Sequence, residues 1–157
     1  MSARRTVRYS TLSEVVQDAE HLIGNHHTVG HWSFGQICQH LAKVMDASID
    51  GFGFTAPWWV RWFIAPIIKN SFFTKPMKAG FKLPKRASAL LPDDSITADE
   101  GLRKLRAGVE RLSHETPTAP HPVFGKLASE EVTQGHLRHC EMHMSFIIPG
   151  ENGQPPT

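Results

Sequence analysis

The sequence predicts an all-α fold, a four-helix bundle with one long crossover. Four segments carry apolar residues at spacings of three and four, which is the period of a helix face. No segment shows the alternating pattern of a β-strand. The connections are unequal, because residues 53–96 separate the second segment from the third while the other two connections are short. A long connection of this kind can cross a bundle.

The first two helices are predicted from capping patterns and apolar faces. Thr11 and Ser33 are each followed three residues later by Glu or Gln, the spacing of a capping box. The first helix is expected to end at Gly24, and the second at Gly51 or shortly after. The first apolar face is Leu12, Val15, Val16, Ala19, Leu22 and Ile23. The second is Phe34, Ile37, Cys38, Leu41, Val44, Met45, Ser48 and Phe52.

The last two helices follow the same logic. Thr97 opens the third with another capping pattern, and its leucine and valine stripe ends before Pro117. The fourth is predicted from Ser129, with two acids in its first turn where the helix dipole favours them, to Ile148. Both predicted ends precede residues that break helices.

Length and composition indicate a single domain. The 157 residues weigh 17.6 kDa, and we expect residues 1–150 to fold as one domain followed by a disordered tail over 151–157. A net charge of +2 does not by itself favour nucleic acid. Cys38 and Cys140 are too few for a disulfide framework, and no secretory signal is apparent, so we expect a reducing, cytoplasmic location.

The long crossover is basic and aromatic. Residues 51–92 contain seven cations and no acid. The cations are Arg61, Lys69, Lys75, Lys78, Lys82, Lys85 and Arg86. The apolar run over 57–69 is interrupted by charges and a proline, so we expect no transmembrane span. This run is either a short helix packed across the bundle end or a contact with a membrane surface or a second subunit, and exposed tryptophans in it would point to a homodimer. The role of the whole crossover over residues 54–86 stays open.

Helix four carries three histidines on the line that faces the core of a bundle. Val132, His136, His139, His143 and Phe146 follow at spacings of four, three, four and three. Burying three imidazoles without partners is unfavourable, and a metal ion would satisfy them. His139 and His143 have the i, i+4 spacing that lets two imidazoles reach one ion.

Other residues could complete this site. His40, at the margin of the second helix's apolar face, could be a further ligand or a hydrogen-bonded structural residue. His136 could be a fourth ligand, a partner of a ligand or polar packing. His121 lies in a rigid loop, where it could either lie over a bundle end near the site or serve the packing of the loop. Gln36 is a further pocket candidate. The cysteines are interpreted as small core residues.

Two motifs resemble those of DinB/YfiT-like proteins. The first is WSFGQICQHLA over residues 32–42. The second is HPVFGKL over 121–127 followed by HCEMH over 139–143. The pair looks most similar to a DinB-like family of unknown function. The resemblance implies a four-helix bundle in up-down-down-up order. It also implies a divalent metal, zinc or nickel, held by His40, His139 and His143. Val132 departs from the family pattern, which often has tryptophan there.

The resemblance implies a metal-dependent enzyme acting on a small molecule, either a hydrolase or a thiol-dependent transferase. Three neutral imidazoles would leave the ion positions open to water or a thiol. The alternative is a non-catalytic bundle that binds metal structurally or docks to a membrane or subunit. A nucleic-acid binder is disfavoured, because the aromatic residues precede the basic ones instead of interleaving with them.

Overall fold

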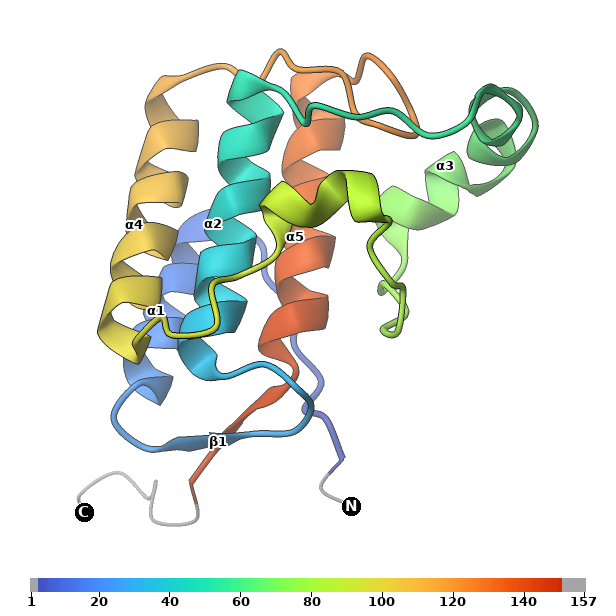
Figure 1. The fold of residues 1–157 in the computed structure, drawn as a ribbon. Coiled ribbons are helices and arrows are strands. Elements are labelled where there is room, and N and C mark those ends of the chain that lie inside the picture. The colour runs from blue at the N-terminus through green and yellow to red at the C-terminus, as the bar shows by residue number, and fades with distance from the viewer. Residues whose placement is uncertain (1–2, 151–157) are drawn as a thin grey trace.

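The computed structural model describes residues 3–150 as a mostly helical protein (Figure 1). The long helices are α1 (Leu12–Leu22), α2 (Phe34–Asp50), α4 (Ala98–His114) and α5 (Ser129–Met144). The connection between α2 and α4 contains the π-helical turn η1 (Val60–Ile64), α3 (Ala65–Thr74) and the 3-10 helix η2 (Lys85–Leu90). The tail predicted over 151–157 lies outside the described residues.

A short antiparallel strand pair ties the ends of α1 and α5 together. Strand β1 (His26–Thr28) follows α1, strand β2 (Ile147–Pro149) follows α5, and His27 lies opposite Ile148. The expectation of helix up to Ile148 and of no strand was therefore wrong. Three residues are too few to display an alternating pattern, so only the pairing itself reveals this sheet.

Three of the long helices begin with the predicted capping boxes. Thr11, Ser33 and Thr97 each accept a bond from the backbone N–H three residues on, and the side chain at that position bonds back. Capping satisfies N–H groups that have no partner within the helix. The buried core is formed mainly by Val15, Ala19, Leu22, Phe34, Ile37, Leu41, Met45, Leu102, Leu105, Leu137 and Met144.

Helices α2 and α4 pack along an unusually close seam of small residues, and both begin near the β1 end (Figure 1). A Cβ atom on Gly35 would lie 2.4 Å from the carbonyl oxygen of Thr97, and one on Gly101 would lie 2.4 Å from that of Gly35. Farther along, a Cβ on Gly108 would touch Ala42 at 3.4 Å. The absence of side chains at these glycines therefore sets the spacing of the two helices, and with it the position of α2.

The crossover divides into two parts. In η2, Ala87 and Leu90 are buried and cluster with Ala47 of α2. By contrast, α3 projects to one side of α5 (Figure 1), and its buried residues are Ala65 and Phe73. Phe73 packs on Gly135, where a Cβ atom would approach the ring to 3.0 Å. Among residues 3–150 no helix has the length and apolarity needed to span a membrane.

Candidate metal centre

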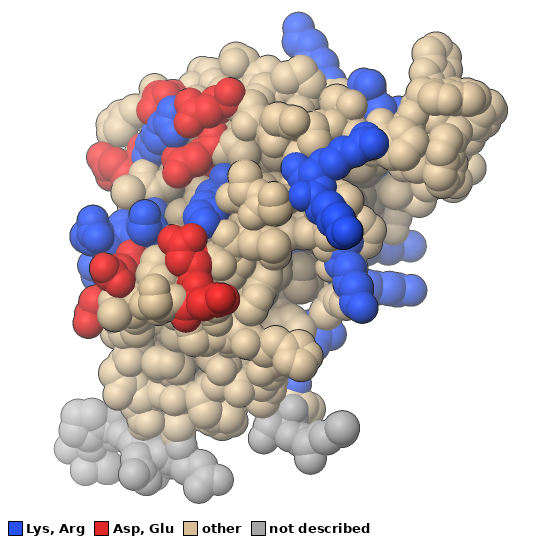
Figure 2. Space-filling view, viewed as in Figure 1, with Lys and Arg blue, Asp and Glu red and all other residues tan. Residues whose placement is uncertain are grey.

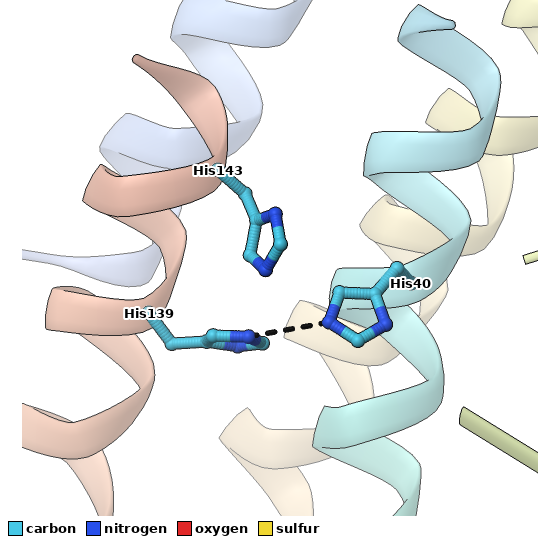
Figure 3. Close-up of side chains that lie close together, drawn as sticks. All are labelled: His40, His139 and His143. Atoms are coloured by element: carbon cyan, nitrogen blue, oxygen red, sulfur yellow. Dashed lines mark hydrogen bonds between the residues drawn. The ribbon is translucent and has the colours of Figure 1, made fainter. Parts of the chain in front are cut away.

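Helices α2 and α5 bring three histidines together. His40 lies near the middle of α2, and His139 and His143 are one turn apart on α5. Each offers a ring nitrogen, and these three atoms lie within 4.8 Å of one another. Figure 3 shows the three rings converging on the space between the two helices. His40 is buried, whereas His139 and His143 are half-buried, so the group borders solvent on the α5 side.

A backbone carbonyl fixes the tautomer of His40. Its Nδ1 lies 2.7 Å from the carbonyl oxygen of Leu90 in η2. A carbonyl can only accept, so Nδ1 carries the proton and Nε2 presents a lone pair. That Nε2 lies 3.3 Å from Nε2 of His139, the contact dashed in Figure 3. Two imidazole nitrogens that face each other need either one proton or one cation between them.

The donor set fits a divalent metal ion. Two imidazoles on a tetrahedral ion, with bonds of about 2.0–2.1 Å, place their nitrogens about 3.3 Å apart. Burial lowers the pKa of His40, of His139 and of His143, the last to about 3. All three are therefore neutral near pH 7, which is the form that binds metal. The carbonyl bond on the far nitrogen of His40 is the usual partner of a ligating imidazole.

Trp32 forms one wall of the histidine group. Its ring stacks on His143, with centroids 5.4 Å apart and planes at 14°, and tilts against His40 at 4.8 Å. It sits just before the capping residue of α2, which holds it at the β1 end of the group. The indole therefore limits the rotation of two of the three imidazoles and keeps water from one side.

His136 lies one turn before His139 and has a different partner. Its Nε2 lies 3.0 Å from the hydroxyl oxygen of Ser48, and that hydroxyl donates to the carbonyl of Met45 at 2.6 Å. The hydroxyl proton is thereby used, so His136 donates and Ser48 accepts. Burial lowers the pKa of His136 to about 4, so the ring is neutral. Of the three roles left open by the sequence, the structure places His136 as a buried hydrogen-bond donor outside the three-nitrogen group.

His121 lies in an aromatic pocket of the loop before α5. Its Nδ1 accepts the backbone N–H groups of Val123 and Phe124, at 3.1 and 3.2 Å. Its ring stacks on Phe124 and meets Phe52 and Phe72 edge-on or tilted. Burial lowers its pKa to about 4. The loop that holds it also accepts the N–H of Ala56, which attaches the start of the crossover.

The remaining candidates have structural partners. The Gln36 side chain completes the cap of α2 by accepting the N–H of Ser33 at 2.9 Å. Cys38 and Cys140 are buried, and burial raises the pKa of both thiols, that of Cys38 to about 12. Neutral thiols are poor metal ligands, which agrees with their interpretation as core residues.

Sequence reasoning missed three contributors to this region. The Leu90 carbonyl left no signal, because any residue supplies a carbonyl. Ser48 counted only as a member of the apolar face of α2. Trp32 opened the recognised motif, but its contact with both helices becomes apparent only when α2 and α5 are placed side by side.

Comparison with known proteins identifies a family but no activity. A family model described as "Protein of unknown function (DUF1569)" matches residues 1–150. Searches of curated proteins and of solved structures each returned no match.

Proposed function

Given that this chain belongs to the DUF1569 family of unknown function, we propose that it is a metal-dependent enzyme of the DinB/YfiT-like superfamily. In this proposal residues 1–150 form one up-down-down-up four-helix bundle. His40, His139 and His143 hold a divalent ion, zinc or nickel, and the substrate is a small molecule. The reaction is hydrolysis or transfer to a thiol, in the cytoplasm.

The convergence of three neutral ring nitrogens within 4.8 Å carries the proposal. Two of these nitrogens face each other at 3.3 Å, and one has its lone pair exposed by the Leu90 carbonyl. Protons alone cannot give each of these ring nitrogens a good partner, whereas one metal cation can accept a lone pair from all three.

The bound ion would act as a Lewis acid that activates water or a thiol. The chain's own residues would prepare the site for this. Leu90 holds the proton of His40 on Nδ1 and so keeps Nε2 available. Trp32 restrains the rings of His40 and His143 and shields one side from water.

The hydrogen bond of His136 favours an enzyme over a structural metal site. Structural zinc sites have four protein ligands, whereas catalytic sites leave at least one position open. The remaining histidine of α5 is His136, and its Nε2 is directed to the Ser48 hydroxyl and not to the three ligand nitrogens. Three protein ligands therefore support a site open to substrate, and a non-catalytic metal-binding bundle is the alternative.

Elemental analysis tests the metal site first. We expect roughly one zinc or nickel ion per purified chain, and at least about 100-fold weaker binding in His139→Ala and His143→Ala. The matched control is His114→Ala, because His114 is exposed on α4 and its partner is Glu110. A parent protein that stays metal-free after incubation with both ions, or variants that bind as well as the parent, would contradict the proposal.

A second experiment separates the enzyme from the non-catalytic alternative. The metal-loaded protein is assayed with low-molecular-weight thiols plus electrophiles, and with small amides. Turnover that disappears in His139→Ala but persists in His114→Ala supports the enzyme. Stoichiometric metal without turnover on either class favours the structural alternative.

A further inference from the structure

The part of the crossover that projects from the bundle exposes a dense apolar patch. We call residues 58–68 the aromatic arm; they comprise the residue pair before η1, η1 itself and the first turn of α3. Trp62 is 76% exposed, Ile67 78% and Trp58 69%. The other large apolar residues exposed on the arm are Trp59, Phe63, Ile64 and Ile68. Contiguous exposed apolar surface of this kind marks an interaction site.

The arm packs against α5 through one face, and its opposite face is exposed among residues 3–150. Ala65 and Phe73 are the buried residues of α3, and Phe73 packs against Gly135 of α5. Lys69 on the same side pairs with Glu131 at 2.8 Å. In η1 no residue is buried. The anchoring side fixes the orientation of the arm, and the remaining sides present tryptophan, phenylalanine and isoleucine outward.

The surroundings of the arm are positively charged. Residues 51–92 carry seven cations and no acid. In Figure 2 the basic side chains beside and below the arm have no acidic side chains among them, whereas over α2 and α4, on the other side of this face, acidic and basic side chains are mixed. Arg61 lies within the arm, and Lys75 and Lys78 follow α3 directly. An exposed apolar surface with cations beside it fits a partner that has an apolar interior and an anionic surface.

We propose that the aromatic arm docks this protein onto an anionic lipid bilayer, with η1 and α3 lying at the level of the headgroups. Tryptophan prefers this interface because its ring is apolar while its N–H remains hydrated. Short amphipathic helices bind there when an apolar face is combined with nearby lysine and arginine. Anionic headgroups supply negative charge opposite the lysine and arginine side chains of the crossover, which has no acidic residue of its own over 51–92.

Charge disfavours a second copy of the chain as the occupant. A two-fold symmetric interface would bring the same patch of each chain into contact. Arg61, Lys75 and Lys78 of one arm would then face the same three cations of the other, with no acid in residues 51–92 of either chain to offset them. A bilayer that contains anionic lipid avoids this repulsion.

Vesicle flotation of the full chain tests the proposal. Vesicles of phosphatidylcholine alone are compared with vesicles that contain about 30% phosphatidylglycerol. We expect at least about tenfold more bound protein on the anionic vesicles, and a loss of most binding when salt rises from about 0.1 to about 0.5 M. Tryptophan emission is expected to shift to shorter wavelength on binding.

Paired variants separate the two components of the surface. Trp62→Ser/Ile67→Ser removes apolar contact, and Lys75→Glu/Lys78→Glu reverses charge beside the arm. The matched control is Arg103→Glu/Lys104→Glu, which makes the same charge change on exposed residues of α4. We expect both arm variants to lose flotation and the control to keep it, with circular dichroism verifying that each variant is folded.

Three results would overturn the proposal. The first is equal or no binding to the two vesicle types. The second is equal loss of binding in the control and arm variants. The third combines two measurements. Light scattering shows that the parent protein is a dimer and that Trp62→Ser/Ile67→Ser is a monomer, and neither protein binds lipid. This last result would assign the arm to a subunit interface.

Discussion

The seam between α2 and α4 and the aromatic arm use side chains in opposite ways. At the seam, Gly35 and Gly101 let two backbones approach until a single added carbon would collide. On the arm, large apolar side chains such as Trp62 and Ile67 remain mostly exposed. In these two regions, whether a residue is buried depends on whether another element packs against it. The apolar character of its side chain does not decide this alone.

The crossover contains both a closely packed part and an exposed apolar part. Its last part, η2, packs Ala87 and Leu90 on α2 and turns the Leu90 carbonyl toward His40. Its first part leaves the long helices after Ala56 and carries the arm. One connection thus supports the histidine group from inside and presents a contact surface outside. The predictions below test this division, from the largest expected effect to the smallest.

Adding one carbon at the seam should have the largest effect. In Gly101→Ala the new Cβ would meet the backbone of Gly35 at 2.4 Å, and backbone cannot move aside cheaply. We expect the free energy of unfolding to fall by about 3 kcal/mol, measured by chemical denaturation. The matched control is Gly24→Ala, since a Cβ on Gly24 meets nothing within 4 Å. Equal stability of the two variants would show that the seam is not tightly packed.

The buried His136 should make the stability of the fold sensitive to acid. Its folded-state pKa is lowered to about 4 from 6.5, so the unfolded chain binds more protons between these values. Its contribution to stability is complete above pH 6.5 and is lost as the pH falls toward 4, at up to about 1.4 kcal/mol per pH unit.

The variant His136→Gln isolates this contribution. Glutamine can still donate to Ser48 but does not titrate. In metal-free protein, we expect the loss of stability between pH 6.5 and 4 to be smaller in the variant than in the parent, measured by denaturation at several pH values. A parallel pH dependence in the two proteins would mean that His136 is already able to accept a proton in the folded state.

The helices were predictable because their signals are local. Capping residues such as Thr11, Ser33 and Thr97 sit beside the segments they begin, and the apolar period repeats within each helix. The strand pair was missed because its three-residue partners lie more than a hundred positions apart. The exposure of the arm was equally out of reach, because an apolar run has the same pattern whether or not another element covers it.

The candidate site likewise combines features that the sequence predicts locally with features that depend on how the helices pack. The i, i+4 spacing of His139 and His143 is local. His40 was a possible ligand from its place at the margin of a helix face, and the resemblance to a known family implied that it is one. Their convergence depends on how α2 and α5 pack, which periodicity does not specify. The Leu90 carbonyl that sets the His40 tautomer is a backbone group and has no sequence signature.

Two kinds of tryptophan should respond differently to metal. Trp32 stacks on His143 and contacts His40, whereas Trp59 is exposed on the arm. We expect Trp32→Leu to weaken zinc binding about tenfold, because it removes a restraint on two rings, and Trp59→Leu to leave it unchanged. Competition with a chromophoric chelator measures both affinities. Equal affinities would show that the rings are held by other contacts.

The smallest effect should come from the arm itself. Trp62→Ser/Ile67→Ser removes two large apolar side chains, and in a core each such change would lower the free energy of unfolding by several kcal/mol. Both residues are more than three-quarters exposed, so little contact within the chain is lost. We expect the free energy of unfolding, measured by the same denaturation as for Gly101→Ala, to change by less than about 0.5 kcal/mol. A fall as large as that of the seam variant would mean that the arm is covered in solution, by a second copy or by other parts of this chain. A small change in the free energy of unfolding would show that these side chains contribute little to folding. Their apolar surface is then free to bind a partner.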